Sequence, residues 1–186
     1  MAKTINFCGD SFCEYRNNTS WCTQLADQLN CDQIGEGKAG AAHEHAIQSF
    51  NPQADITVFC WTEPTRVHHS EYPLSFGSCS DLRNTHAVYE AGYRFYKWIH
   101  ENQYFIDRQK RDFYWFENEV LSNYSGLCIH LWSFRKTYQW KHGYDLLRSP
   151  LMSYSNRFPG RINHFNPKFN QILSKKLYNF IRSLHG

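Results

Sequence analysis

Hydrophobic residues near the start of the chain follow two successive spacings, which predict a strand and then a helix. The β-prone run from Thr4 to Cys8 ends at Gly9 and predicts a short strand. Apolar residues then recur every four positions, as expected for one face of a helix of about three turns: Trp21, Leu25 and Leu29. The polar residues at 17–20 (NNTS) precede this pattern and are candidates for the helix N-cap.

A glycine-rich segment at 35–40 separates this helix from the next elements. A second helix is expected through residues 46–50, and Asn51-Pro52 ends it. The run 55–61 (DITVFCW) is nearly all apolar, which is typical of a central strand covered on both faces. Strand, helix, optional short strand, helix and strand in this order predict an α/β fold with a parallel sheet.

The remainder of the chain predicts fewer regular elements. Residues 65–85 are polar and are expected to be irregular, whereas the aromatic-rich segment 86–122 predicts two helices with a break near Ile106-Asp107. Residues 127–134 (LCIHLWSF) predict another buried strand, and residues 135–163 are expected to form loops.

The C-terminal segment predicts a long amphipathic helix. Asn166 is a good N-cap and Pro167 suits the first helical position. One helical face then carries the apolar residues: Phe169, Ile172, Leu173, Leu177, Phe180, Ile181 and Leu184.

The aromatic segment 86–122 has two interpretations. Its aromatic residues alternate with basic ones, as on a surface that stacks single-stranded nucleic acid: Arg94, Lys97, Arg108, Lys110 and Arg111. The same pattern describes an amphipathic helix pair with an aromatic core face and a solvated basic face. We favour the helix pair.

Composition indicates one globular domain over residues 1–186. Of the 186 residues, 41% are hydrophobic and 17% aromatic, which suffices for a core and argues against a disordered chain. Lys and Arg number 20 against 17 for Asp and Glu, so the net charge of +3 is too small to indicate nucleic-acid binding. Nucleic acid is therefore not an expected partner, and the lack of a long apolar stretch means that no membrane is expected either.

The cysteines and the N-terminal sequence indicate a reducing compartment. Seven cysteines are present, no CxxC pair occurs, and several lie in apolar runs, so buried free thiols are expected rather than disulfides. The start of the chain lacks the apolar region of a signal peptide, and no apolar stretch is long enough to span a membrane. We expect cytoplasmic synthesis without a signal peptide, which is compatible with later association with a virus particle.

The segment Gly9-Asp10-Ser11 carries the first candidate chemistry. A strand that leads into it places the Ser11 hydroxyl at the carboxyl edge of the sheet, and a helix follows shortly after. Backbone N–H groups at such a position can stabilise an oxyanion. The alternative is an ordinary strand-to-helix turn in which Asp10 and Ser11 act as caps.

The sequence Gly9-Asp10-Ser11-Phe12, followed by Trp21-x-x-x-Leu25-Ala26-x-x-Leu29, resembles the opening block of the SGNH (GDSL-type) hydrolases. The resemblance implies that Ser11 is the nucleophile of an ester hydrolase. It also implies a three-layer α/β/α sandwich with a small parallel sheet, flavodoxin-like in style, and no cofactor.

Two further segments are similar to the blocks that complete the oxyanion hole in this family. Gly40 matches the glycine of the second block, and Gly37 is the alternative. Thr62 and Glu63 follow the strand 56–59 where the family has asparagine and aspartate. This variant of the third block resembles small bacteriophage-encoded members. The resemblance implies that the Ser11 and Gly40 N–H groups, with the Thr62 hydroxyl, bind the oxyanion.

The segment before the last helix is similar to the block that carries the catalytic base. His164, followed by Asn166-Pro167, matches that base in position. The family aspartate, however, is replaced by Arg161. Loss of the orienting acid can cost several orders of magnitude in turnover. We therefore expect a Ser-His dyad oriented by a main-chain carbonyl of residues 159–162, or Asp145 as a relocated acid.

Other candidate sites are weaker. His43-Glu44-His45 and His68-His69 lack the spacing of known metal motifs, so no metal is expected. Cys13 is expected to serve packing and not nucleophilic attack. Arg66, and Glu63 beside it, could hold a substrate anion or anchor the loop, or could form a surface ion pair.

These observations support two hypotheses on function. The first is a serine ester hydrolase that acts on a small acyl ester or an O-acylated carbohydrate through Ser11 and His164. The second is a non-catalytic module of the same fold, for example in a virus particle. The missing acid keeps the second hypothesis open, because a fold does not determine a function.

Overall fold

The computed structural model describes residues 3–14 and 18–184, and these are built around a parallel β-sheet. The predicted α/β class is confirmed. Five strands lie in the order β2-β1-β3-β4-β5, and every neighbouring pair is parallel. Their bounds are β1 Lys3–Gly9, β2 Cys31–Gln33, β3 Ile56–Trp61, β4 Leu127–Trp132 and β5 Tyr144–Asp145.

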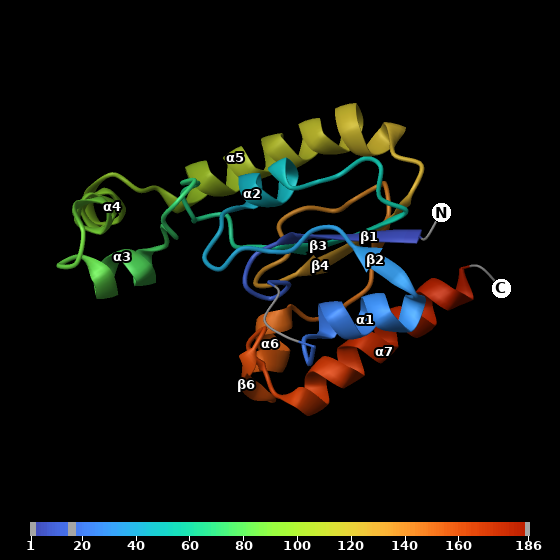
Figure 1. Ribbon diagram of the computed structural model, residues 1–186. Coiled ribbons are helices and arrows are strands. Elements are labelled where there is room, and N and C mark those ends of the chain that lie inside the picture. The colour runs from blue at the N-terminus through green and yellow to red at the C-terminus, as the bar shows by residue number, and fades with distance from the viewer. Residues whose placement is uncertain (1–2, 15–17, 185–186) are drawn as a thin grey trace.

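The central strand of the sheet is β3, as its apolar run predicts. All six of its residues are buried. It pairs with β1 from Ile56 opposite Ile5 to Cys60 opposite Gly9, and with β4 from Ile56 opposite Leu127 to Trp61 opposite Trp132. Because all strands run the same way, their carboxyl ends meet at one edge of the sheet, on the left in Figure 1.

Helices lie on both faces of the sheet (Figure 1). One face carries α1 (Trp21–Leu29) and α7 (Pro167–Ser183), which lie side by side, and the other carries α2 (His43–Gln48) and α5 (Asn102–Trp115). The core is divided accordingly. Trp21 and Leu177 belong to the cluster on the α1–α7 face, whereas Trp61 and Phe113 belong to the cluster on the α5 face.

Two helices form an arm that extends beyond the carboxyl edge of the sheet (Figure 1). They are α3 (Phe76–Leu82) and α4 (Ala87–Trp98), and α4 has no buried residue. The expectation of an irregular segment at 65–85 is wrong in part, because α3 lies within it. Side chains stabilise both helix starts: Ser75 accepts a hydrogen bond from Ser78 N, and His86 accepts one from Val88 N.

The prediction of two helices in segment 86–122 is confirmed, but their boundary differs. The break lies at residues 99–101, between α4 and α5, and not near Ile106. At its end α5 continues into a π-helical turn, Phe116–Val120. Buried Glu117 in this turn accepts hydrogen bonds from the Tyr138 hydroxyl (2.7 Å) and from His142 N (3.1 Å). The turn thereby fixes the long connection after β4.

The segment 135–163 contains short elements where loops were expected. They are β5, α6 (Leu151–Ser155) and β6 (Pro159–Ile162), and β6 lies outside the sheet. The C-terminal helix is confirmed: Asn166 accepts a hydrogen bond from Phe169 N (2.9 Å), and Pro167 begins α7. The cap position of α1 is Ser20, whose side chain makes no cap bond, while the candidate Asn17 lies outside the described residues.

The cysteines are free thiols, as predicted. Six of the seven are buried, and Cys31 is partly exposed. Burial raises the pKa of Cys60 to about 11 and also raises the pKa of Cys13, so both are protonated at neutral pH. A thiol must ionise to act as a nucleophile, so burial of Cys13 favours the packing role.

No described helix has the length and apolar character needed to cross a bilayer.

Candidate active site

The end of β1 places Ser11 at the carboxyl edge of the sheet. Gly9 is required there because a Cβ atom at this position would lie 2.3 Å from the Cys60 carbonyl oxygen of the neighbouring strand. Asp10 follows, fully buried, and its Oδ1 accepts hydrogen bonds from Phe12 N (3.0 Å) and from the Ser133 hydroxyl (2.9 Å). Asp10 thus caps the turn that presents Ser11 and ties it to the end of β4.

The charge environment of Asp10 also involves the segment after β3. Burial raises the pKa of Asp10, while the Arg66 guanidinium, 4.0 Å away, acts in the opposite direction. The Thr62 side chain has a smaller effect in that same direction. No hydrogen bond of ordinary geometry joins Thr62 Oγ1 and Asp10 Oδ2, and within the described residues both atoms are buried and accept or donate no hydrogen bond.

His164 is presented by a tight turn at the end of β6. Ile162 and Phe165 form an antiparallel bridge, and the two residues between them, Asn163 and His164, have φ values of 51° and 65°. Two successive positive φ values characterise a type I′ turn. The imidazole rests on buried Phe12, with 4.6 Å between the ring centroids. The main-chain oxygen of His164 accepts a hydrogen bond from the Ser155 hydroxyl (2.9 Å).

Ser11 and His164 meet although they are 153 residues apart in sequence. Ser11 Oγ lies 2.7 Å from His164 Nε2, which is the distance of a hydrogen bond between them. Ser11 is partly exposed and His164 is exposed, so the pair is open to solvent. A serine hydroxyl bonded to an imidazole nitrogen is the arrangement in which the histidine can take the proton as the serine attacks.

The segment predicted to supply an oxyanion donor lies against the loop after β1, which presents Ser11. Lys38 N donates to Gly9 O and Gly37 N donates to Cys13 O, both over 3.0 Å. The Gly37 N–H is therefore used, which leaves Gly40 as the candidate donor. Gly40 has a φ of 69°, and a Cβ atom there would lie 2.2 Å from Pro73 Cβ. Among the described residues, the N–H groups of Ser11 and Gly40 donate to no other group.

The Thr62 hydroxyl is less favourably placed for an oxyanion. Thr62 is 2% exposed, and its oxygen is covered. A donor to the oxyanion must be within reach of the substrate. The Thr62 hydroxyl is buried beside Asp10, and from this position it could not reach a ligand bound at the surface.

Arg66 anchors the loop that follows β3. Its guanidinium is buried, pairs with Glu63 (3.1 Å), donates to Ala41 O (3.3 Å) and lies over the Phe134 ring. Of the alternatives for Arg66, the loop-anchoring role agrees best with these contacts. Because Ala41 follows Gly40, Arg66 links the segment after β3 to the candidate oxyanion segment.

Neither the position of the family acid, which is Arg161, nor Asp145 supplies a carboxylate to His164. The Asp145 carboxylate lies 2.5 Å from Lys136 Nζ and accepts a hydrogen bond from Trp132 Nε1 (3.3 Å). Within residues 3–14 and 18–184 its contacts do not include Ser11 or His164. Arg161 is exposed on β6. The Asp145 carboxylate therefore pairs with Lys136 and Trp132 and not with His164.

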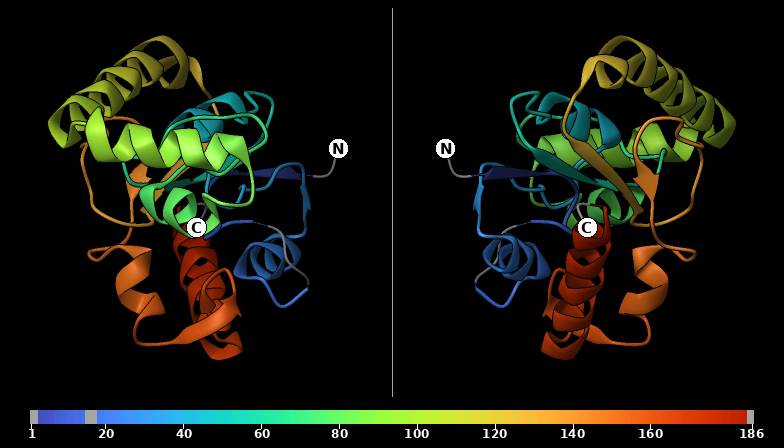
Figure 2. Two further views of the ribbon diagram at one scale, coloured as in Figure 1. Left: turned by 90° about the vertical axis from the view of Figure 1, so that its left-hand side faces the viewer. Right: turned by 90° about the vertical axis from the view of Figure 1, so that its right-hand side faces the viewer.

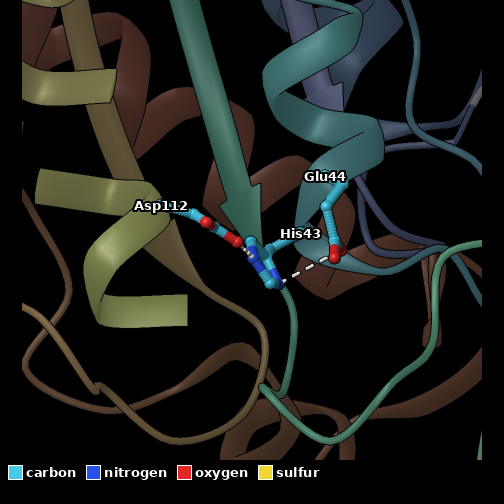
Figure 3. Close-up of side chains that lie close together, drawn as sticks. All are labelled: His43, Glu44 and Asp112. Carbon is cyan, nitrogen blue, oxygen red and sulfur yellow. Dashed lines mark hydrogen bonds and ion pairs between the residues drawn. The ribbon is translucent and has the colours of Figure 1, made fainter. Parts of the chain in front are cut away.

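One group of candidate metal ligands lies within the described part of the chain, on the other face of the sheet. His43, Glu44 and Asp112 have ligand atoms within 4.8 Å of one another. The two carboxylates, however, face opposite ring nitrogens: Asp112 lies 2.7 Å from Nε2, and Glu44 lies 3.3 Å from Nδ1 (Figure 3). Glu44 is also paired with Arg108 at 2.8 Å. We interpret the group as a polar contact between α2 and α5.

The sequence did not single out Asn163, which precedes His164 and contacts the loop that carries Ser11. It is 2% exposed, and its side chain bonds to Ser11 O, Glu14 O and the Ser20 hydroxyl. The only sequence signal was an asparagine before the candidate base, and asparagine favours left-handed turns.

Comparison of the chain with models of known protein families and with curated proteins gave no match.

Proposed function

We propose that the protein is a serine ester hydrolase of the SGNH type, with Ser11 as nucleophile and His164 as general base. The observation that carries the proposal is the 2.7 Å contact between Ser11 Oγ and His164 Nε2. It agrees with the order of the sequence blocks, since the serine follows the first strand and the histidine precedes the last helix. The parallel sheet between two groups of helices is compatible with the α/β/α sandwich of that superfamily.

The reaction would proceed through an acyl-enzyme. Ser11 Oγ attacks the acyl carbonyl carbon while its proton moves to His164 Nε2, and the imidazolium then gives that proton to the departing alcohol oxygen. Water attacks the resulting ester with His164 as base, and the carboxylic acid leaves as Ser11 regains its proton. The main-chain N–H groups of Ser11 and Gly40 are the proposed oxyanion donors. Thr62 is not assigned to this role, because its hydroxyl is buried.

The exposure of the pair bears on the substrate. Ser11 is partly exposed and His164 is exposed, at the edge of the sheet from which the α3–α4 arm extends (Figure 2, left, in green). An open site of this kind is accessible to an acyl group carried on a larger molecule. A small acyl ester or an O-acylated carbohydrate is therefore the proposed substrate class.

The second candidate is a non-catalytic module of the same fold, such as a component of a virus particle. It is favoured by Arg161 at the position of the family acid and by the position of Asp145, whose carboxylate is bound to Lys136. A triad acid stabilises the imidazolium that forms during acylation, and its replacement lowers kcat by about 10⁴-fold.

A fluorophosphonate probe separates the two candidates, because it phosphonylates a serine only where a base activates it. We expect intact-mass analysis to find one adduct, peptide mapping to place it on Ser11, and Ser11→Ala to abolish it. Cys13→Ser, at a buried neighbour, is a matched control that should be labelled like the wild type. A folded wild type that takes up no probe would favour the non-catalytic module.

A further inference from the structure

Asn163 lies between the loop after β1, here called the nucleophile loop (residues 10–14), and the turn that carries His164. Its Nδ2 donates to Ser11 O (3.3 Å) and to Glu14 O (2.7 Å), both in the nucleophile loop. Its Oδ1 accepts a hydrogen bond from the Ser20 hydroxyl (2.6 Å). One buried amide thus binds the nucleophile loop, the start of α1 and, through its own backbone, the turn that carries His164.

The backbone at this position restricts which residue can occupy it. Asn163 has a φ of 51°, in the left-handed region that few side chains other than asparagine, aspartate and glycine adopt readily. Glycine would permit the turn but supply no amide. Aspartate would permit the turn and accept from Ser20, but it would face the carbonyls of Ser11 and Glu14 with oxygen atoms only. Asparagine is the residue that satisfies the turn and all three contacts.

A second buried amide, that of Asn170, holds the residues that flank the same turn. Asn170 Nδ2 donates to Ile162 O (3.1 Å), and its Oδ1 accepts from Trp21 N at the start of α1 (3.1 Å). Asn170 Nδ2 also donates to Phe165 O (3.4 Å), so this one amide contacts both residues that flank the turn and links them to α1. Asn163 differs from Asn170 because it bonds directly to the main chain of Ser11.

From these contacts we propose that Asn163 is a positioning residue that sets the distance between Ser11 and His164, an inference that rests on the proposed hydrolase function. In an ordinary triad the acid holds the imidazole ring by a bond to Nδ1. Here the amide fixes the backbone from which the imidazole projects and, at the same time, the main chain of the nucleophile. Because a misplacement of about 1 Å can lower a rate about 100-fold, loss of this amide would reduce turnover without removing a reacting group.

The test measures the rate of fluorophosphonate labelling of Ser11, together with kcat and KM for p-nitrophenyl acetate. Asn163→Asp keeps the turn and the contact with Ser20 but loses both amide donors. We expect its labelling rate and kcat to fall 10- to 100-fold, with KM within about threefold of the wild-type value. Asn163→Gly, which keeps the backbone conformation, should show a loss of the same order.

Two further variants keep the test valid if the first ones fold poorly. Ser20→Ala removes the hydroxyl that orients the amide, and it costs α1 no cap bond because Ser20 makes none. We expect a fall of about 3- to 10-fold. Asn166→Ala is the matched control: it loses the cap bond of α7 in the same segment, and its melting temperature should fall while labelling stays within about twofold of the wild type.

The outcomes separate this inference from the proposed function. If the wild type is labelled and Asn163→Asp, Asn163→Gly and Ser20→Ala are labelled equally fast, the positioning role is overturned and the proposed hydrolase function is not affected. A wild type without labelling or ester hydrolysis would overturn both. A slow Asn166→Ala, matching Asn163→Asp at equal loss of melting temperature, would assign the effect to general destabilisation and overturn the positioning role.

Discussion

The Asp145 carboxylate is bound to Lys136, with 2.5 Å between Oδ2 and Nζ, on the edge strand β5. If this carboxylate oriented His164, the pair would be a triad and not a Ser-His dyad. Asp145→Asn should lower kcat for p-nitrophenyl acetate less than about tenfold, because the lost interaction is with Lys136 and not with His164. Replacement of a true triad acid lowers kcat by about 10⁴-fold. A loss of 100-fold or more in folded Asp145→Asn would restore Asp145 as the third member.

Ser11 and His164 should act as one unit. Ser11→Ala and His164→Ala should each remove most of the hydrolysis of p-nitrophenyl acetate, and the double variant should be hardly slower than either one, because each change disables the same step. Initial rates with circular dichroism as the folding control measure this. Independent, multiplicative losses would argue against a dyad, and equal rates in all proteins would support the non-catalytic module.

Thr62 provides a test of the oxyanion assignment. Its hydroxyl is buried beside Asp10, so Thr62→Val, which keeps the shape of the side chain, should lower kcat less than about tenfold. Loss of a real oxyanion donor lowers kcat by about 10²- to 10³-fold. Steady-state kinetics distinguish the two ranges, and a loss in the larger range would return Thr62 to the oxyanion site.

His130 predicts how stability depends on pH. Its Nδ1 accepts from Trp61 Nε1 (2.9 Å), its Nε2 donates to His142 O (2.9 Å), and Trp140 stacks on the ring. Burial lowers its pKa from 6.5 to about 3. The contribution of neutral His130 to the free energy of unfolding is therefore complete above about pH 6.5. It is lost as the pH falls toward 3, because in that interval His130 takes up a proton only in the unfolded chain.

The expected size of this effect is about 2 kcal/mol of unfolding free energy lost between pH 6.5 and 5. Urea unfolding of the wild type and of His130→Gln at pH 7 and pH 5 measures it. The variant is less stable at pH 7, but its stability should change less with pH, since the amide does not titrate. Parallel pH dependences in the two proteins would contradict the assignment to His130.

The helices and strands that could be predicted from the sequence are those whose own residues show a clear apolar pattern or cap. The apolar run of β3 is typical of a strand that is covered on both faces, and α7 combines an asparagine cap, a proline at its first position and a regular apolar face. The short elements β5, α6 and β6 were not predicted because two to five residues show no periodicity. They are fixed by contacts such as Met152 N with Ser133 O, which sequence does not display.

The candidate site was predictable to a similar extent. A motif identified Ser11, and a position before the last helix identified His164. Their contact depends on the φ angles of Asn163 and His164 and on bonds between segments about 150 residues apart, which no local pattern encodes. The burial of the Thr62 hydroxyl and the pairing of Asp145 with Lys136 likewise arise only when distant segments pack.

The packing of α1 against α7 has a consequence for the nascent chain. Ser11 and α1 leave the ribosome early, but the side of α1 that packs against α7 stays uncovered until α7 has been made and has docked. Asn163 and His164 directly precede α7 in the sequence and so emerge just before it. The contact between Ser11 and His164 therefore forms only once α7 has docked, so a chain interrupted before His164 would expose the α7-facing side of α1 to chaperones and, under the proposed mechanism, would lack the base that activates Ser11.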